Sequence, residues 1–451
     1  MEPPPVVAPK ASQKDMYAAL KLPYHYLLAC VGAVIFGNPS RKLEVIAVTG
    51  TKGKSSVVEL VSALLEEAGY KTAHASTIAF KIGDKTERNL HKMTMPGRFF
   101  LQSFLRKAVK AGCTHAIIEM TSEGARQFRH KFISLDALIF TNLAPEHIES
   151  HGSYEKYVAA KVSIAKALER SQKQHKVLVV NGDDKESQKF LDVFSGTKLT
   201  YGARDAGGPV VAPEGISFNW NGVRIESLLP GEFNLYNILA AITYAKAAGI
   251  STEHIKSGIQ KVTTIKGRAE KISLEVLSSK FEENTTTPPY GHPSSPEEGR
   301  RPQDFTVIVD YAHTPESLEQ LYQAYAGKYR RCVLGNAGGG RDTWKRPVMA
   351  GIAERYCDEI ILTNEDPYDE DPETIIRDMA AGMKSKQPTL ILSRRTAIHE
   401  ALQRSSKGDV VLISGKGTDP YIMGPNGTKE VWDDATVVKE ELQKILSQRK
   451  L

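Results

Sequence analysis

The residues most able to do chemistry lie in one short stretch near the N-terminus. An apolar, β-branched run at positions 45–48 is followed by TGTKGKSS at positions 49–56. Backbone N–H groups of such a glycine turn, with the N-terminus of the following helix, bind phosphate oxygens. Lys54 would then reach the β- and γ-phosphates, and the Ser55 hydroxyl would bind Mg²⁺. The stretch predicts a nucleotide site, with a loop one residue tighter than the usual GxxxxGK[ST]; the alternative is an ordinary strand-to-helix turn.

Further polar groups follow two other apolar runs, at 116–118 and 137–140. The first run ends in Glu119, which suits a Mg²⁺ ligand at the carboxyl end of a strand beside the phosphate loop; the alternative is a solvated loop acid. The second run is followed by His147 and His151. Zinc is disfavoured because no third soft ligand is near, so we expect one histidine on a hard cation or a surface pair. Lys161, taken alone, is expected on a helix surface.

Three later positions could contact a nucleotide. Asn234 and Asn237 lie three apart, hence on one helix face, and could bind a base edge, unless Asn234 simply caps the helix. Arg268 follows Gly267 at a predicted domain junction, a place from which an arginine can reach the γ-phosphate after closure. Asp310 ends a predicted strand and could accept hydrogen bonds from ribose hydroxyls.

The elements that must position these groups alternate as in α/β proteins. We expect buried parallel strands at 116–118, 137–140 and 177–180, a hairpin with a type I′ turn at 216–229, and a helix at 233–249. A second α/β domain is expected from strands at 306–309, 332–334, 360–362, 390–392 and 410–413. The predicted fold is a central P-loop ATPase-like domain with a mostly parallel sheet (43–266) and a C-terminal Rossmann-like domain (267–451), after an N-terminal tail and apolar helical segment (1–42). Residues 278–304 form a Pro- and Glu-rich insertion, expected to be mobile.

Net charge, cysteine spacing and hydrophobicity indicate which partners and which cell compartment to expect. The 451 residues carry a net charge of only +6 and no dominant Lys/Arg block, so no nucleic-acid partner is predicted. The four cysteines lie far apart and are expected to be reduced thiols in a cytoplasmic protein. Residues 24–37 are the most lipophilic stretch, too short to span a membrane. This stretch is expected to be a helix docked on the next domain, or else a contact with lipid or a lipid-linked substrate.

Taken together, these motifs resemble those of the Mur ligases, ATP-dependent amide-forming enzymes of peptidoglycan synthesis. Residues 50–56 resemble the family's GT-x-GK-T/S-T/S loop, and 119–129 resemble its E-V-S-S-H-G-x-x-x-x-R segment. Residues 141–143 with His147, His151-Gly152 and 159–161 resemble T-N-L-x-x-D-H-L-D-Y-H-G followed by A-A-K. The strings at 231–237, 267–268 and 310–315 follow in family order, and the last of these, with 339–346, is typical of the tripeptide synthetase branch.

The resemblance implies a role for each matched residue. ATP would be bound by Gly50, Thr51, Lys52, Gly53, Lys54, Ser55, Ser56, Asn237, Arg268 and Asp310. Mg²⁺ would be bound by Ser55, Glu119, His147 and Lys161, the lysine being carbamylated by CO₂. Catalytic roles fall to Lys54, His147, Lys161 and Arg268. Substrates would contact Thr94, Thr121, Ser122, Arg129, Arg341, Glu365, Asp366, Tyr368, Gly415 and Asp419.

Departures from the family pattern bear on the substrates. About forty residues precede the P-loop strand, too few for the family's uridine-nucleotide domain, so we expect that domain to be lacking and the acceptor to be held otherwise or to be lipid-linked. Tyr368 stands where the diaminopimelate-adding enzymes have an arginine. The acids of the loop around it favour a side-chain ammonium, and the alternative is that they are solvated and cap the next helix: Glu365, Asp366, Asp369, Glu370 and Asp371. Asp419, in the string GKGTD at 415–419 where the family has G-K-G-H-E, is expected to contact the incoming amine.

The predicted function is therefore the ATP-dependent addition of an amino acid, L-lysine or another diamino acid, to a muramoyl dipeptide through an acyl phosphate. The enzyme is expected to be a cytoplasmic monomer. One alternative is a ligase like folylpolyglutamate synthase, against which the string DYAHTP at 310–315 argues. Another is a non-catalytic nucleotide-binding partner subunit.

Overall fold

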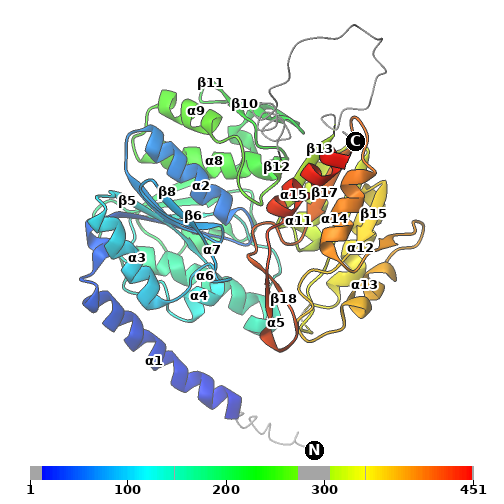
Figure 1. Ribbon diagram of the computed structural model, residues 1–451. Helices are drawn as coiled ribbons and strands as arrows, with labels where there is room; N and C mark the ends of the chain where they lie inside the picture. The colour runs from blue at the N-terminus through cyan, green and yellow to red at the C-terminus, as the bar shows by residue number, and fades with distance from the viewer. Residues whose placement is uncertain (1–12, 147, 273–304, 341, 449–451) are drawn as a thin grey trace, which may run out of the picture. The chain divides into compact units, whose positions relative to one another are not determined.

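The computed structural model describes residues 13–146, 148–272, 305–340 and 342–448 (Figure 1). The predicted insertion at 278–304 therefore lies outside the described residues. The chain forms two compact units: the first comprises Met1–Thr51, Gly69–Glu87 and Met93–Thr200, and the second Lys52–Ala68, Arg88–Lys92 and Tyr201–Leu451. The domain limits predicted from the sequence, 43–266 and 267–451, stay a prediction.

An eight-stranded sheet forms the centre of the first unit, in the order β4-β3-β2-β5-β1-β6-β7-β8. Its strands are β1 (Glu44–Thr49), β2 (Thr72–Ala75), β3 (Ala79–Ile82), β4 (Lys85–Arg88), β5 (His115–Met120), β6 (Ala137–Phe140), β7 (Val177–Asn181) and β8 (Thr197–Tyr201). β1 pairs in parallel with both β5 and β6, and β7 pairs in parallel with β6, which confirms the predicted buried strands. Both neighbours of β1 come later in the chain, so the strand order changes direction there; ligands of α/β sheets bind at such points.

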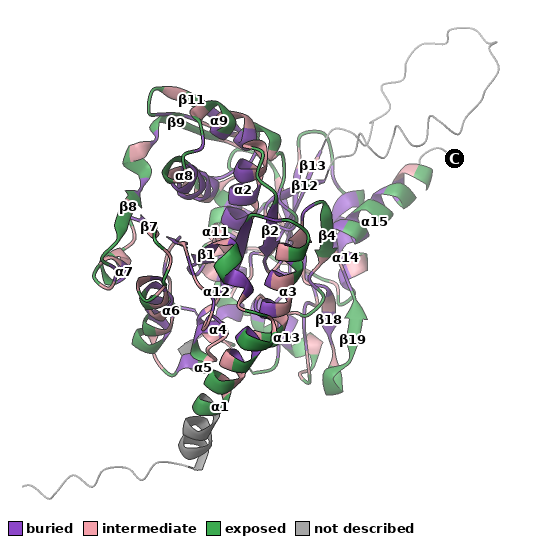
Figure 2. Ribbon diagram, turned by 90° about the vertical axis from the view of Figure 1, so that its left-hand side faces the viewer, coloured by how far each residue is buried: buried purple, intermediate pink, exposed green. Residues whose placement is uncertain are grey.

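Helices cover this sheet through their apolar faces. They include α3 (Arg98–Lys110), α6 (Tyr154–Glu169) and α7 (Ser187–Leu191). α1 (Gln13–Ile35) packs on α3, and α4 (Ser122–Arg126), α5 (Ile148–His151) and the 3₁₀ turn η1 (Pro39–Lys42) complete the helical elements described in this unit. Leu101 and Leu105 of α3 and Ile164 and Leu168 of α6 are fully buried in one core with β1, β5 and β6. The central strands are correspondingly purple in Figure 2. Within the described residues, no helix combines the length and hydrophobicity that crossing a membrane requires.

In the second unit, α2 (Lys54–Glu67) packs on α8 (Glu232–Ala247) and α9 (Thr252–Lys261). Apolar residues at helical spacing on α2 are all fully buried: Val57, Leu60, Val61, Leu64 and Leu65. A three-stranded sheet follows the order β11 (Val223–Ser227), β10 (Gly215–Trp220), β9 (Gly207–Ala212), with the short turn η2 (Ala203–Asp205) before it. Asn221 and Gly222 have φ angles of 49° and 80°, which confirms the predicted type I′ hairpin.

The C-terminal part of the second unit is a six-stranded, mostly parallel sheet in the order β12-β13-β17-β14-β15-β16. Its strands are β12 (Glu270–Ile272), β13 (Thr306–Asp310), β14 (Arg330–Leu334), β15 (Glu359–Leu362), β16 (Thr389–Leu390) and β17 (Val410–Ser414). Alternate residues face opposite sides, since Cys332 and Leu334 join one core and Val333 joins the other. Helices α11 (Pro315–Gln323), α12 (Lys345–Tyr356) and α13 (Pro372–Ala380) cover one face, and α14 (Arg394–Gln403) and α15 (Asp434–Gln448) the other. The predicted Rossmann-like α/β arrangement is confirmed. A small hairpin of β18 (Tyr421–Met423) and β19 (Lys429–Val431), joined by η3 (Pro425–Gly427), completes the unit.

Two cysteines correct the prediction of four reduced thiols. Cys332 of β14 and Cys357, just before β15, form a disulfide with Cα atoms 6.1 Å apart. Their separation of 25 residues along the chain hides their proximity in space. The connection through α12 returns the chain to the strand next to β14, so the residue that precedes β15 lies beside it. Cys30 and Cys113 are free thiols, as predicted.

Candidate active site

The start of the phosphate loop is held by the segment that follows β6, all within the first unit. The Thr51 N–H donates to the Asn142 carbonyl at 2.8 Å, and the Thr51 hydroxyl lies 2.7 Å from the Tyr157 hydroxyl. Gly50 has a φ of +150°, and a Cβ there would lie 1.9 Å from the Thr141 Oγ1. A side chain at position 50 therefore has no room, which explains why the turn needs glycine.

Lys161 lies against this loop rather than on the surface. The side chain is buried, its Nζ donates to the Gly50 carbonyl at 2.6 Å, and the same atom lies 4.9 Å from the centre of the Tyr157 ring. The surface position expected from the sequence taken alone is therefore wrong, because α6 turns this face toward the carboxyl end of β1. The position agrees with the resemblance, which assigns Lys161 to the catalytic centre.

Glu119 is also buried, at the carboxyl end of β5 next to β1, so the solvated-acid alternative is wrong. Its two carboxylate oxygens accept hydrogen bonds from Thr77, one from the N–H at 2.8 Å and one from the hydroxyl at 3.0 Å. The Thr77 hydroxyl lies 2.7 Å from that of Thr94, a predicted substrate residue. The structure thus brings Glu119 and Thr94 together through a threonine that the sequence reasoning missed.

No three histidine, cysteine or acidic side chains gather as metal ligands in the part of the chain that the structure describes. Among the residues predicted to bind Mg²⁺, Glu119 is the only described one with a histidine, cysteine or acidic side chain. Of the other members, His147 lies outside the described residues, Ser55 supplies a hydroxyl, and Lys161 would need a carbamate. The predicted metal site therefore stays a prediction.

The segment after β5 arranges three further predicted residues. The Thr121 side chain caps α4 by accepting a hydrogen bond from the Gly124 N–H at 3.1 Å. Ser122 Oγ lies 3.1 Å from Nε2 of His151, which is buried and whose pKa is lowered by that burial and by the nearby Arg126. Arg129 is half-buried and donates to the Met95 carbonyl. These residues line one loop region of the first unit, and their substrate roles stay predictions.

In the second unit, the predicted nucleotide residues meet at the N-terminus of α2. Gly53 precedes this helix with a φ of 82°, and a Cβ there would lie 2.3 Å from the Asn237 Oδ1. Lys54, Ser55 and Ser56 form the first turn of the helix. An Arg268 Nη atom donates to the Ser55 hydroxyl at 3.4 Å, and its guanidinium lies 4.7 Å from the centre of the Tyr311 ring. Arg268 is thus positioned beside a predicted phosphate-binding residue.

The two asparagines of α8 form a polar pair on one helix face. The Asn237 amide donates to the Asn234 Oδ1 at 3.0 Å, and the Asn234 amide donates to the Pro230 carbonyl at 2.8 Å. The residue that caps α8 is Gly231, so the alternative that Asn234 is the cap is wrong. Asn237 instead lies against the phosphate loop, where the predicted contact with ATP would place it.

Asp310, at the end of β13, accepts hydrogen bonds from two backbone N–H groups. One carboxylate oxygen accepts from the Ala269 N–H at 2.5 Å and the other from the Ala312 N–H at 2.6 Å. Burial raises the pKa of this carboxyl, while Arg268 and the two backbone N–H groups oppose the rise. Asp310 thus holds the turn that carries Arg268, and its predicted contact with ATP stays a prediction.

Three acidic residues of the loop after β15 each have a separate structural partner. Asp371 caps α13, accepting from the Thr374 N–H at 3.1 Å, which confirms the capping alternative for this residue. Glu370 forms an ion pair with Arg346 at 2.5 Å. Asp369 accepts from the Asn426 N–H at 2.7 Å. These three acids have local structural partners, so the loop's charge is not gathered in one pocket.

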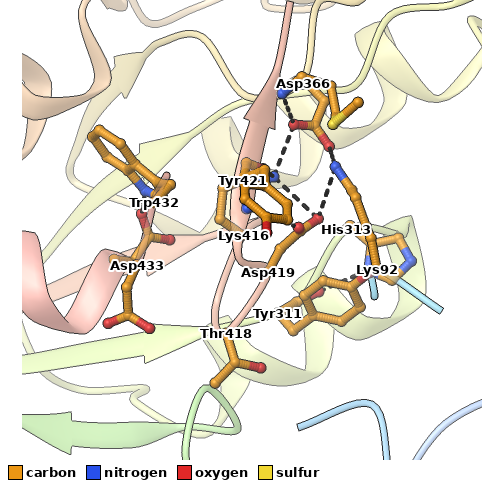
Figure 3. Close-up of polar contacts among 12 residues, drawn as sticks. Lys92, Tyr311, His313, Asp366, Lys416, Thr418, Asp419, Tyr421, Trp432 and Asp433 are labelled. Carbon is orange, nitrogen blue, oxygen red and sulfur yellow. Dashed lines mark hydrogen bonds and ion pairs between the residues drawn. The ribbon is translucent and has the colours of Figure 1, made fainter. Parts of the chain in front are cut away.

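Asp366 and Asp419 form a different arrangement, which we call the carboxylate pair (Figure 3). Two lysines bridge them: Lys416 Nζ lies 2.8 Å from Asp366 and 3.0 Å from Asp419, and Lys92 Nζ lies 2.6 Å and 3.3 Å from the same two carboxylates. The Met423 N–H adds a hydrogen bond to Asp366 at 2.8 Å. Burial raises the pKa of Asp366, but the two lysines outweigh it and hold that pKa below its usual value.

Glu365 lies beside the carboxylate pair and is buried. Its Oε2 atom has no hydrogen-bond partner among the described residues, and a Cβ on Gly415 would lie 2.3 Å from it. Burial raises the pKa of this carboxyl to about 7, against the opposing charges of Arg394 and Lys416. Tyr368 adopts a left-handed φ of 52°, and its ring lies 5.7 Å from the Lys92 ammonium. Arg341 lies outside the described residues.

Sequence reasoning missed the two lysines of this arrangement. Lys416 lies between the predicted substrate residues Gly415 and Asp419, so a base three residues before an acid could have indicated it. No local signal indicates Lys92, because its partner Asp366 is 274 residues away.

Comparison with known proteins identifies the family. Residues 48–245 match the family model of the Mur ligase middle domain, and residues 298–417 match that of the Mur ligase glutamate ligase domain. A UDP-N-acetylmuramyl-tripeptide synthetase of Roseiflexus sp. (strain RS-1) is 34% identical over 95% of this chain and 84% of that protein. A UDP-N-acetylmuramoyl-L-alanyl-D-glutamate–2,6-diaminopimelate ligase of Geobacillus kaustophilus is 32% identical, over 96% of this chain and 86% of that protein.

Solved structures show the same fold. A UDP-N-acetylmuramoyl-L-alanyl-D-glutamate–2,6-diaminopimelate ligase matches with a TM-score of 0.59 and 27% identity, over 91% of this chain and 79% of that one. The folylpolyglutamate synthase of Mycobacterium tuberculosis matches with a TM-score of 0.65 over 90% of this chain and 95% of that one. Its identity is only 16%, so the second likeness concerns the fold alone.

Proposed function

The chain belongs to the Mur ligase family, and on that premise we propose that it joins L-lysine, or another diamino acid, to a muramoyl-dipeptide acceptor. Members of the family are ATP-dependent, ADP-forming amide ligases, and this chain is such a ligase, adding an amino acid in peptidoglycan synthesis. The observation that carries the choice of amino acid is the carboxylate pair, Asp366 and Asp419, which binds two ammonium groups in the C-terminal part of the second unit. Such a pair suits a substrate that carries a side-chain ammonium.

The proposed reaction has two steps. A carboxylate oxygen of the acceptor attacks the γ-phosphorus of ATP, and the bond between that phosphorus and the β-phosphate oxygen breaks. ADP departs, and the acceptor becomes an acyl phosphate. The neutral amine of the amino acid then attacks the acyl carbon, phosphate departs, and the amine proton is lost to give the amide. Lys54 and Arg268 stabilise the charge that develops on the transferred phosphoryl group. The bond from Arg268 to Ser55 in the first turn of α2 supports this assignment.

Mg²⁺ is the metal expected for the family, and the described residues fit it in part. Glu119 offers a buried, oriented carboxylate, and Ser55 offers a hydroxyl at a helix N-terminus. When bound, Mg²⁺ neutralises phosphate charge. Lys161 would be repelled by a cation as an ammonium, whereas as a carbamate it would attract one. The carbamate keeps one N–H, so the observed bond to the Gly50 carbonyl is compatible with the modification.

Diaminopimelate is the amino acid named for two of the relatives, and it differs from L-lysine in charge at the end of the side chain. Diaminopimelate carries a second carboxylate beside its distal ammonium. That carboxylate would face Asp366 and Asp419, and Tyr368 supplies no positive charge to offset the repulsion. Lysine offers the ammonium without the added carboxylate, and we therefore favour it.

We also propose that α1 contacts a membrane surface or a lipid-linked acceptor. One face of this helix is docked, because the Tyr26 ring contacts those of Phe128 and Phe132. Large apolar side chains at other positions of this helix are exposed, among them Leu27 at 61% and Val34 at 66%. Exposed apolar residues at helical spacing are typical of interfacial helices.

The test is a panel of amino acids crossed with UDP-linked, lipid-linked and free muramoyl-dipeptide acceptors, with release of phosphate from ATP as the readout. We expect phosphate release to require an acceptor and to be highest with L-lysine or a close diamine. Activity with diaminopimelate alone would reject the choice of amino acid and keep the ligase. Activity only with a folate and glutamate would reject the muramoyl acceptor.

A further inference from the structure

Lys92 holds an unusual position in the second unit. It has a left-handed φ of 52°, and its ammonium contacts both members of the carboxylate pair (Figure 3). Arg88 fixes the start of the same short segment: its guanidinium donates to the carbonyls of Thr418 at 3.1 Å and Trp432 at 2.8 Å, and lies 3.0 Å from the Asp433 carboxylate. Arg88 therefore anchors the start of the segment 88–92, and Lys92 anchors its end on the carboxylate pair.

The two lysines that bridge the pair are held very differently. The Lys416 side chain is only 1% exposed, and its Nζ makes a further hydrogen bond to the Tyr421 carbonyl at 2.5 Å. The Lys92 side chain is 23% exposed, and its other contact is the face of the Tyr368 ring, 5.7 Å from its Nζ. Lys92 is therefore the bridging cation that can leave, whereas Lys416 is part of the buried structure.

The charges of the carboxylate pair and of the two lysines that bridge it are balanced. Asp366 and Asp419 supply two negative charges, and Lys92 and Lys416 supply two positive charges. A further ammonium that entered would be a third cation for two anions, in surroundings where like charges are poorly screened. A substrate ammonium that replaces that of Lys92 is bound here with no net change of charge.

We propose that Lys92 is a specificity-determining residue whose ammonium occupies the place of the substrate's side-chain ammonium until the substrate displaces it. This proposal rests on the proposed function, since it names how the same carboxylate pair selects a diamino acid. A diamino acid replaces Lys92 charge for charge. A neutral amino acid of the same length would leave the two carboxylates with one cation, and so does not displace it.

The kinetic test compares Lys92→Met, which keeps much of the side-chain length and removes the charge, with Lys85→Met, an exposed lysine of β4. We expect the KM for L-lysine to fall by about tenfold in Lys92→Met, because no internal ammonium competes, and to stay unchanged in Lys85→Met. L-norleucine, the neutral counterpart of lysine, should remain a poor substrate of all three proteins. An unchanged or raised KM for L-lysine in Lys92→Met would overturn the proposal.

Amide hydrogen exchange of residues 88–92 tests the same idea without catalysis. L-lysine should accelerate exchange in this segment of the wild-type protein, L-norleucine should not, and Lys92→Met should exchange faster with no ligand present. If Lys92→Met exchanges as slowly as wild type, Lys92 does not hold the segment and the proposal fails, whatever amino acid the enzyme uses. If the segment loosens in Lys92→Met while the enzyme ligates only neutral amino acids, the proposed function is wrong and Lys92 is a structural contact, which also rejects the specificity role.

Discussion

At the scale of single residues, burial decides what the ionisable groups near the C-terminal sheet can do. Glu365 and Asp366 are neighbours in sequence, yet burial raises the pKa of Glu365 to about 7, while two lysines hold that of Asp366 below its usual value. The difference follows from contacts and not from residue type, because one carboxylate faces a glycine backbone and the other faces two ammonium groups.

Glu365→Gln should change how stability depends on pH. The folded carboxyl, with its pKa raised to about 7, keeps a proton that the unfolded chain releases above its ordinary pKa, so the wild-type protein loses stability as pH rises through this window. The loss should reach about 3 kcal/mol above the folded pKa. The free energy of unfolding of Glu365→Gln, relative to that of wild type, should therefore be higher at pH 8 than at pH 5. Denaturant unfolding at the two pH values measures this difference. Glu430→Gln, on the exposed edge of β19, is the control; equal pH dependence of Glu365→Gln and wild type would contradict the prediction.

Lys161→Ala should lose about 100-fold or more in activity, since it removes the proposed carbamate. Short carboxylic acids such as acetate should restore part of the lost activity, because they can supply the missing carboxylate. The control is Lys166→Ala on the exposed face of the same helix, which should keep wild-type activity. Full activity of Lys161→Ala would exclude the carbamate, and thermal unfolding of each variant separates this loss from a folding defect.

At the scale of elements, short connections at the carboxyl ends of strands position the chemical groups. β1, β5 and β6 end side by side, so the turn after β1, Glu119 after β5 and Thr141 after β6 lie at one edge of the sheet. In the other sheet, β14 and β15 are adjacent, and the disulfide between Cys332 and Cys357 ties β14 to the residue after α12. Each arrangement follows from strand pairing, which joins distant parts of the chain.

The disulfide should determine how many thiols titrate and how reductant affects stability. In the absence of reductant, the unfolded protein should titrate two thiols, those of Cys30 and Cys113, and after reduction four. Reduction should lower the free energy of unfolding by about 3 kcal/mol, as expected for a closed loop of this size. A Cys332→Ala/Cys357→Ala variant should show no effect of reductant on stability. Four titrating thiols without reductant would show that the bond does not form.

At the scale of the whole molecule, the surface that α1 presents has no explanation in the reaction itself. Tyr24, Leu27, Val34 and Ile35 are each more than half exposed, at 58%, 61%, 66% and 64%. Arg41, just beyond the helix, is exposed, and the Arg106 guanidinium approaches the backbone at Gly37. An apolar helix face with cations near its end suits an anionic membrane surface.

Binding to vesicles tests this surface. The protein should sediment with vesicles that contain anionic lipid, and less so at high salt, because the electrostatic part of the attraction is screened. Leu27→Asp/Val34→Asp should reduce the bound fraction severalfold by placing charge in the apolar face. Val431→Asp, at an exposed apolar site on β19, is the matched control and should bind like wild type. Equal binding by both variants would exclude the contact.

Much of the fold follows from the sequence by itself, because the responsible signals are local. The β-branched runs of β1, β6 and β7, the helical spacing of Val57, Leu60 and Leu64, and the turn at Asn221-Gly222 act over a few residues. Those local signals, with the order of the motifs, also indicated the family and the phosphate loop.

Tertiary structure alone decided which distant groups meet. Lys161 donates to Gly50 across 111 residues, and Lys92 pairs with Asp366 across 274. The cysteine pair and the different environments of Glu365 and Asp366 depend likewise on contacts between neighbouring elements. Burial and charge pairing depend on distance in space, and residues far apart in sequence carry no local pattern that reveals that distance.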